Sequence, residues 1–239
     1  MFATTARTVK YSQLMSILKS KDESLFADNS WIWEGKFKFF DQSEHLGIQG
    51  KRNTIQLTSF PRSGNSFLRR TTEKLTGIAS GSVMPMAPFN MAMPLQLVGY
   101  NGEGHTDDRV FCVKAHHPLE LGFKTYNATK TVVCIRNPLD VFPSYAALSN
   151  TNSHDNRPDF EIHSEYPEWW TWFVKLQTGL MKRFFTTILK DCQENKQNPL
   201  YIIRYEDMVL KQEEALTGLF SFILEQKDLT GTNAERRIA

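Results

Sequence analysis

The feature that most constrains this chain is an apolar run that stops at a proline and is followed at once by a helical pattern. Residues 54–60 have the pattern of a β-strand, and Pro61 ends that pattern. A helical pattern then extends from about Gly64 to Thr76. A loop between a strand and a helix N-terminus presents unpaired N–H groups at the positive end of the helix dipole. The segment therefore predicts a phosphate cradle.

Further apolar runs alternate with helical patterns along the rest of the chain. Strands are expected at residues 110–113, 131–135 and 200–204, and helices at residues 138–148, 167–193 and 206–224. Continuously apolar strands that alternate with helices indicate a mostly parallel sheet with helices on both faces. We therefore expect a three-layer α/β domain whose ligand binds beyond the carboxyl ends of the strands.

The length of the chain, 239 residues, and its hydrophobic content of 41% suit one sizeable core. We expect a single globular unit, with residues 1–50 as an N-terminal covering segment and residues 51–239 as the main domain. The covering segment contains a short helical pattern at residues 11–19. It also contains an aromatic patch that resembles a strand or packing arm, formed by Trp31, Trp33, Phe37, Phe39 and Phe40.

Charge and composition exclude several classes of protein. The 28 basic and 26 acidic residues nearly cancel and are interspersed, which argues against a nucleic-acid partner. Cys112, Cys134 and Cys192 are widely spaced, so we expect reduced, structural thiols rather than a metal site. The chain shows neither a signal-peptide core nor a membrane span, so a cytoplasmic protein is expected.

The loop after the first predicted strand contains the parts of an anion site. Gly64 permits close backbone approach, and Arg62 supplies a permanent charge. Ser63, Asn65 and Ser66 supply short donors. The alternative is an ordinary Pro-Ser-Gly turn. The nucleotide-triphosphatase pattern G-x-x-x-x-G-K-[ST] is not met, because its first glycine is absent and Asn65 stands in place of the lysine, which disfavours a kinase or ATPase.

Four segments of the sequence resemble motifs of the sulfotransferase family, in that family's chain order. Residues 61–64, P-R-S-G, resemble its phosphosulfate loop, and residues 113–118, V-K-A-H-H-P, are similar to its V-K-T-H-x-P. Residues 136–144 resemble its R-[DN]-P-x-D-x-x-x-S element for a 3′-phosphate, and residues 205–208 its Y-E-D-M element, which is mainly structural. An arginine at a strand end and a serine about two turns into the next helix can converge on one phosphate. The resemblance covers approximately residues 53–226.

The resemblance implies a P-loop NTPase-like sulfotransferase fold and an activity. A PAPS-dependent sulfotransferase would bind 3′-phosphoadenosine 5′-phosphosulfate (PAPS) or its product adenosine 3′,5′-bisphosphate (PAP), and sulfuryl transfer requires no metal. By the resemblance, Lys114 contacts the sulfuryl group together with Arg62, His116 is the general base, and Arg136 and Ser144 bind the 3′-phosphate. His117 is the alternate base, because two adjacent histidines cannot be ranked from sequence.

Some expectations have alternatives that the sequence leaves open. Phe67 stands where cytosolic members carry a tryptophan that stacks on adenine, and it is equally compatible with a core position. The methionine-rich loop at residues 83–93 could cover an apolar acceptor. Trp169, Trp170 and Trp172 could line the same cavity, although aromatic residues at helical spacing more often form core.

The resemblance is incomplete after residue 226. Family members generally carry a basic R-K-G-x-x-G element there, whereas this sequence ends at residues 235–239 without it. Three explanations stay open: a truncated chain, partial substitution by Arg236 and Arg237, or weak cofactor binding. The alternative functions are a binding module of the same fold without turnover and, third, a nucleotide or small-molecule kinase. The acceptor, a small molecule, glycan or protein, and the oligomeric state are not specified by the sequence.

Overall fold

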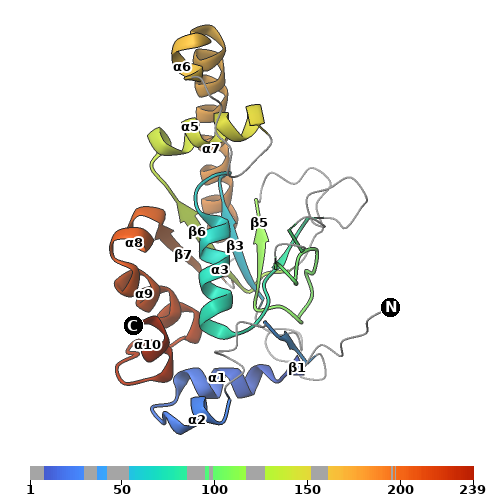
Figure 1. The fold of residues 1–239 in the computed structure, drawn as a ribbon, viewed down its shortest axis with the longest axis vertical. Coiled ribbons are helices and arrows are strands. Elements are labelled where there is room, and N and C mark those ends of the chain that lie inside the picture. The colour runs from blue at the N-terminus through green and yellow to red at the C-terminus, as the bar shows by residue number, and fades with distance from the viewer. Residues whose placement is uncertain are drawn as a thin grey trace.

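The centre of the molecule is a parallel five-stranded sheet (Figure 1). A computed structural model describes residues 8–29, 37–41, 54–84, 95–96, 99–116, 127–151, 161–194, 196 and 198–239. In spatial order the strands are β4 (Gly81–Ser82), β5 (Cys112–Ala115), β3 (Ile55–Ser59), β6 (Lys130–Ile135) and β7 (Leu200–Arg204). Each pairing is parallel, which confirms the expected mostly parallel sheet of an α/β fold.

The strand order places a switch point at the end of β3. Strand β3 pairs with β5 on one side, where Ile55 lies opposite Cys112, and with β6 on the other, where Ile55 lies opposite Lys130. After β3, the chain forms β4 and β5 on one side of it and then crosses to the other side to form β6. Ligands of open α/β sheets bind beyond the carboxyl ends of the strands at such a crossing.

Helices cover both faces of the sheet (Figure 1). One face carries α1 (Tyr11–Lys19), α3 (Asn65–Thr76), α8 (Tyr205–Leu210), α9 (Gln212–Leu224) and α10 (Asn233–Ile238). The other face carries α5 (Pro138–Thr151) and α7 (Pro167–Glu194), with α6 (Ile162–Glu165) beside the end of α7 that projects past the sheet. The remaining elements are α2 (Ser24–Ala27) and a two-residue parallel pair, β1 (Thr8–Val9) and β2 (Phe39–Phe40).

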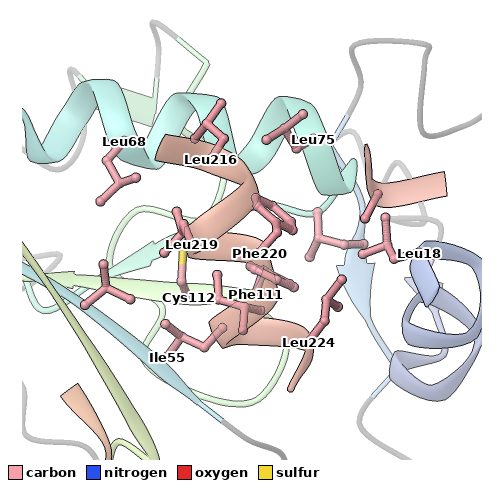
Figure 2. Packing of buried hydrophobic residues seen from close by; sticks show 14 of the residues in the cluster. Leu18, Ile55, Leu68, Leu75, Phe111, Cys112, Leu216, Leu219, Phe220 and Leu224 are labelled. Carbon is pink, nitrogen blue, oxygen red and sulfur yellow. The ribbon is translucent and has the colours of Figure 1, made fainter. Parts of the chain in front are cut away.

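Successive side chains along a strand point to opposite faces of the sheet, so the core consists of two clusters, one on each face. Val132 belongs to the cluster under α3 and α9, whereas its neighbour Val133 packs against α5 and α7. Figure 2 shows the first cluster, in which leucines of α3 and α9 meet side chains of the sheet. Its labelled members include Leu68, Leu75, Leu216, Leu219, Phe220, Ile55 and Cys112. The sheet and α3 are therefore fixed to each other behind the β3–α3 loop.

The two ends of the described chain pack together on the α3 side. Leu14, Ile17 and Leu18 of α1 are buried in the same cluster as the sheet. The side chain of Asn233 in α10 donates to the carbonyl of Ile17 at 3.0 Å. The division of the chain at residue 50 into a covering segment and a domain stays a prediction, and Trp31 and Trp33 of the aromatic patch lie outside the described residues.

Several element boundaries differ from the sequence expectations. The strand expected at residues 110–113 is β5, so Lys114 lies within the strand rather than after it. The helix expected from 206 to 224 is two helices, because Lys211 takes φ −140° and ψ 53° and ends α8. Helix α5 continues to Thr151, beyond the expected end near residue 148.

No helix within the described ranges is both long and apolar enough to cross a membrane.

Candidate functional site

The loop between β3 and α3 forms a tight turn at the carboxyl end of the central strand. The N–H of Ser63 donates to the carbonyl of Phe60 at 3.2 Å, and α3 begins at Asn65. Gly64 has φ 97° and Arg62 has φ 67°, both in the left-handed region that glycine adopts at little cost. A Cβ on Gly64 would also overlap the ring of Tyr205. The N-terminal turn of α3 is therefore open toward the carboxyl edge of the sheet, as a phosphate cradle requires.

The side chain of Asn65, a predicted cradle residue, bonds to the strands of the sheet, whereas the hydroxyl of Ser63 is not used in this way. The amide nitrogen of buried Asn65 donates to the carbonyls of Leu57 at 3.1 Å and Ala115 at 3.2 Å, which joins β3 to β5. The Oγ of Ser63 is buried without a hydrogen-bond partner in the structure. The group of Asn65 that remains for an anion is its backbone N–H at the helix start.

Lys114 and Ser66 meet across the cradle. The Nζ atom of Lys114 lies 3.4 Å from Oγ of exposed Ser66, on the first turn of α3. Burial and, secondly, the charge of the buried Arg69 guanidinium lower the pKa of Lys114 to about 8, while the charge of Glu103 opposes this shift. Lys114 is therefore mostly protonated at neutral pH, but it gives up its proton more readily than an exposed lysine.

His116 follows β5 and faces the end of β3. Its Nδ1 atom lies 2.8 Å from the carbonyl oxygen of Ser59. Because a carbonyl can only accept, this contact assigns the hydrogen to Nδ1 and leaves Nε2 of the neutral ring unprotonated. Burial, and secondly the charge of Lys114, lower the pKa of His116 to about 4, so the ring is neutral at pH 7. The alternate base, His117, lies outside the described residues.

Arg136, at the end of β6, and Ser144, in α5, both bond to Arg62. Arg136 Nη1 donates to the carbonyl of Arg62 at 3.1 Å, and Arg62 Nε donates to Ser144 Oγ at 2.9 Å. These bonds tie the β3–α3 loop to the β6–α5 unit. The three residues thus form one hydrogen-bonded chain at the β3–β6 side of the cradle, in which Arg136 contacts the backbone of Arg62 and Ser144 contacts its side chain.

Tyr205, in the Y-E-D-M segment that the resemblance indicates is mainly structural, lies beside the cradle, a placement that the sequence did not predict. Its ring lies 4.4 Å from the Arg136 guanidinium carbon and packs edge-on against Phe67 at 6.1 Å between centroids. Phe67 is 41% exposed, so it is not a core residue of α3. The rings of Tyr205 and Phe67 together form an aromatic wall beside the cradle, and the Tyr205 ring packs closely against Gly64. The signal in the sequence was an aromatic residue placed directly at a strand end.

Two further residues support the loop from β6 and α8. The thiol of Cys134 lies 2.9 Å from the carbonyl oxygen of Ser63, and burial raises the pKa of Cys134 to about 12. It is a neutral structural thiol, as expected. The carboxylate of Glu206 accepts a hydrogen bond of 2.8 Å from the N–H of Asn137, at the start of α5.

A buried charged network stands behind α3. Arg69 pairs with Glu103 and also donates to the carbonyl of Ser80 at 2.9 Å. Glu73 accepts from the N–H of Ser80 at 3.0 Å, and burial raises the pKa of Glu73. Glu103 also accepts from Ser82 of β4. The network joins α3 to β4, the strand that hydrogen-bonds beside Lys114.

Other predicted residues lie elsewhere. Arg236 pairs with Glu23 at 3.0 Å, and Arg237 donates to the carbonyl of Lys74 near the C-terminal end of α3, opposite the cradle. They do not substitute for a phosphate-binding element at the cradle. Trp169 and Trp170 stack on Phe173 and are partly buried, while Trp172 is exposed. Residues 85–93 of the methionine-rich loop lie outside the described residues.

The described residues fit a nucleotide that carries two anionic groups. An open helix N-terminus with Lys114 at one side and the Arg136–Ser144 pair at the other gives two separate anion positions. Ser63 Oγ and Arg136 Nε are buried and have no hydrogen-bond partner among the described residues, as is also true of some buried atoms elsewhere. Within the same residues there is no cluster of three or more His, Cys, Asp or Glu that could hold a metal.

The chain is similar to a domain family, to a curated relative and to a solved structure. Residues 53–231 match the model of the sulfotransferase domain family. A WSCD family member from Aedes aegypti is 24% identical over 180 residues, which are 75% of this chain and 53% of that protein. The chain thus spans about half the length of that relative. A crystal structure of mouse sulfotransferase SULT7A1 complexed with PAP matches at a TM-score of 0.45 and 19% identity, over 78% of this chain and 62% of that one. By its match to the family model over most of its length, this chain belongs to the sulfotransferase domain family.

Proposed function

We propose that this protein transfers the sulfuryl group of PAPS to a hydroxyl or amine of an acceptor, with His116 as the general base. The observation that carries the proposal is the meeting of a cation, a neutral imidazole and a helix N-terminus at the ends of β3 and β5. Membership of the sulfotransferase domain family supports the transferase class. The PAPS donor and the role of each residue are part of the proposal.

His116 supplies the base. With Nδ1 held at the Ser59 carbonyl, Nε2 takes the proton of the acceptor as the acceptor oxygen or nitrogen becomes bonded to sulfur. A pKa of about 4 keeps Nε2 unprotonated throughout the physiological range. The base is thus always available, and its low proton affinity places the proton transfer late, when the acceptor has become acidic.

Lys114 supplies positive charge at the point where negative charge collects. When bound, the donor nucleotide supplies an activated sulfuryl group on a phosphate leaving group. Lys114 Nζ, beside Ser66 Oγ, neutralises oxygens at the helix N-terminus, and its lowered pKa lets it release a proton to a leaving oxygen. Backbone N–H groups of the first turn of α3 hold the phosphate without moving.

The proposal is tested first by calorimetric titration with adenosine 3′,5′-bisphosphate and with ATP as the control ligand. We expect micromolar or tighter binding for the bisphosphate, none for ATP, and loss of binding in Arg136→Ala. The matched control is Arg183→Ala, which removes an exposed arginine of α7. Absence of bisphosphate binding would overturn the proposed cofactor.

Transfer itself is tested with radiolabelled PAPS and a panel of phenols, amines, sterols and glycans. A labelled product that disappears in His116→Ala supports the enzyme. Nucleotide binding without transfer to any acceptor in the panel would instead support the alternative, a binding module of the same fold. The His116 pKa of about 4 is the observation that keeps this alternative in view, since so weak a base needs an acidic acceptor.

A further inference from the structure

Arg62 extends toward α5. Its Nε donates to Ser144 Oγ at 2.9 Å, although the two residues are 82 positions apart in the chain. Its carbonyl accepts from Arg136 Nη1 at 3.1 Å. Both contacts are therefore made with the two residues assigned to a 3′-phosphate, whereas the sequence resemblance places Arg62 on the sulfuryl group.

The backbone explains why the Arg62 side chain extends in this direction. Arg62 has φ 67°, a left-handed conformation that is unfavourable for a residue with a side chain. The turn from Phe60 to Ser63 and the hydrogen bond from Arg136 hold this conformation. The direction of the Arg62 side chain is thus set by the backbone contacts of the loop as well as by the rotamer of the side chain itself.

The hydrogen bond between Arg62 and Ser144 leaves Ser144 able to bind an anion. Ser144 Oγ is the acceptor in this bond, so its hydroxyl hydrogen remains to be donated to a phosphate oxygen. The guanidinium is planar and carries N–H groups on its two Nη atoms as well as on Nε. A phosphate that accepts from Ser144 would thus lie against the fork of Arg62, with Arg136 on the other side.

From this geometry we propose that Arg62 is a third ligand of the nucleotide 3′-phosphate, with Arg136 and Ser144, and that it sets the preference for a 3′-phosphate over a 3′-hydroxyl. The inference rests on the proposed function, because it assumes the adenosine bisphosphate nucleotide. Lys114 is then the side-chain cation that serves the 5′ end.

The test measures affinity for two nucleotides that differ in the 3′-phosphate alone. Adenosine 3′,5′-bisphosphate and adenosine 5′-monophosphate are titrated into the wild type, Arg62→Met and Arg62→Lys. In Arg62→Met we expect the bisphosphate to bind about tenfold more weakly or worse, the size of a lost charged hydrogen bond, and the monophosphate to change less than about threefold. Arg62→Lys should keep part of the preference because it keeps the charge.

The controls separate this inference from the proposed function. Ser144→Ala combined with Arg62→Met should lose less than the sum of the single losses, because both side chains contact one phosphate. Arg183→Ala, on the exposed face of α7, should leave the ratio of the two affinities unchanged. If Arg62→Met weakens both nucleotides equally, Arg62 serves the 5′ end and the inference is wrong while the proposed function stands. If the wild type binds the two nucleotides equally, or neither, both are wrong.

Discussion

At the scale of single residues, Gly64 is needed for two independent reasons. Its φ of 97° disfavours any side chain, and a Cβ would overlap the ring of Tyr205. We expect Gly64→Ala to lower the free energy of unfolding by about 2–4 kcal/mol, the sum of a left-handed residue and local overpacking. Urea denaturation measures the change.

A double mutant separates the two reasons. In the background of Tyr205→Ala the overlap is gone, so the same substitution at Gly64 should cost only about 1–2 kcal/mol. An equal cost in both backgrounds would mean that the Tyr205 ring moves aside freely. The aromatic wall would then be looser than its contacts with Arg136 and Phe67 indicate.

Lys114 gives the site an alkaline limit. The proposed role needs the protonated amine, and the pKa of about 8 means that this form is lost as the pH rises through 8. We expect kcat/KM for the donor to fall about tenfold per pH unit above that point. In Lys114→Arg the pH above which kcat/KM falls should move beyond pH 10, because a guanidinium keeps its proton. This shift is expected even if the substitution lowers the maximal kcat/KM. A limit that stays near 8 in this variant would assign it to another group.

At the scale of elements, α3 is fixed to β4 by buried charge. Glu103 lies fully buried against Arg69, and Arg69 is itself almost completely buried. We expect Glu103→Gln to cost about 3–5 kcal/mol, since it leaves the guanidinium without its counter-charge. Replacing both residues, as Arg69→Met with Glu103→Leu, should restore much of the loss. Thermal or urea unfolding of the three variants checks this.

Glu103→Gln should also change the pKa of Lys114 in the site. Glu103 raises the pKa of Lys114, so Glu103→Gln should move the alkaline limit of activity below pH 8. A variant that is destabilised but keeps its limit at 8 would show that the network acts through packing alone. Unfolding and the pH profile of Glu103→Gln thus distinguish a role of Glu103 in packing from a role in setting the pKa of Lys114.

The order of elements was predictable from the sequence, because buried strands and amphipathic helices have different periods. Helix α1 and strand β7 have the expected bounds. The break at Lys211 was not predicted, because no Gly or Pro stands there. The run of four polar residues at 211–214 suits an exposed helix turn as well as a helix end. The pairing of β3 with strands far along the chain depends on tertiary packing, which periodicity does not encode.

The site was predictable in its residues but less so in their roles. Motif spacing placed Arg136 near Ser144, and the structure brings them together through Arg62. The use of the Asn65 side chain between β3 and β5 depends on the positions of two carbonyls that are fixed only in the folded sheet. Burial, which sequence does not measure, moved the pKa of His116 well below that of a free imidazole.

At the scale of the whole molecule, His116 links stability to pH. Its pKa falls from the ordinary 6.5 to about 4 on folding, so between these values the unfolded chain binds more protons than the folded one. Stability therefore decreases as the pH falls from 6.5 to 4 and is unaffected by this residue above 6.5. Glu73, whose pKa is raised by burial, has the opposite slope above pH 4.5, so the comparison must be made with His116→Gln.

We expect the difference in unfolding free energy between wild type and His116→Gln to be constant above pH 7 and to shift against the wild type below pH 6. Chemical denaturation at a series of pH values gives this difference directly. A difference that stays constant down to pH 4 would mean that His116 titrates alike in the folded and unfolded states, and that its ring is not held neutral.

The central position of β3 also has a consequence for synthesis. Its partners begin at Cys112 and Lys130, about 57 and 75 residues later than Ile55. At roughly 5–20 residues per second, the ribosome needs some seconds, about 4–15, to supply both. During that interval the apolar strand that will bear the phosphate loop has two unpaired edges, so the nascent chain is most prone to aggregation before its site can exist.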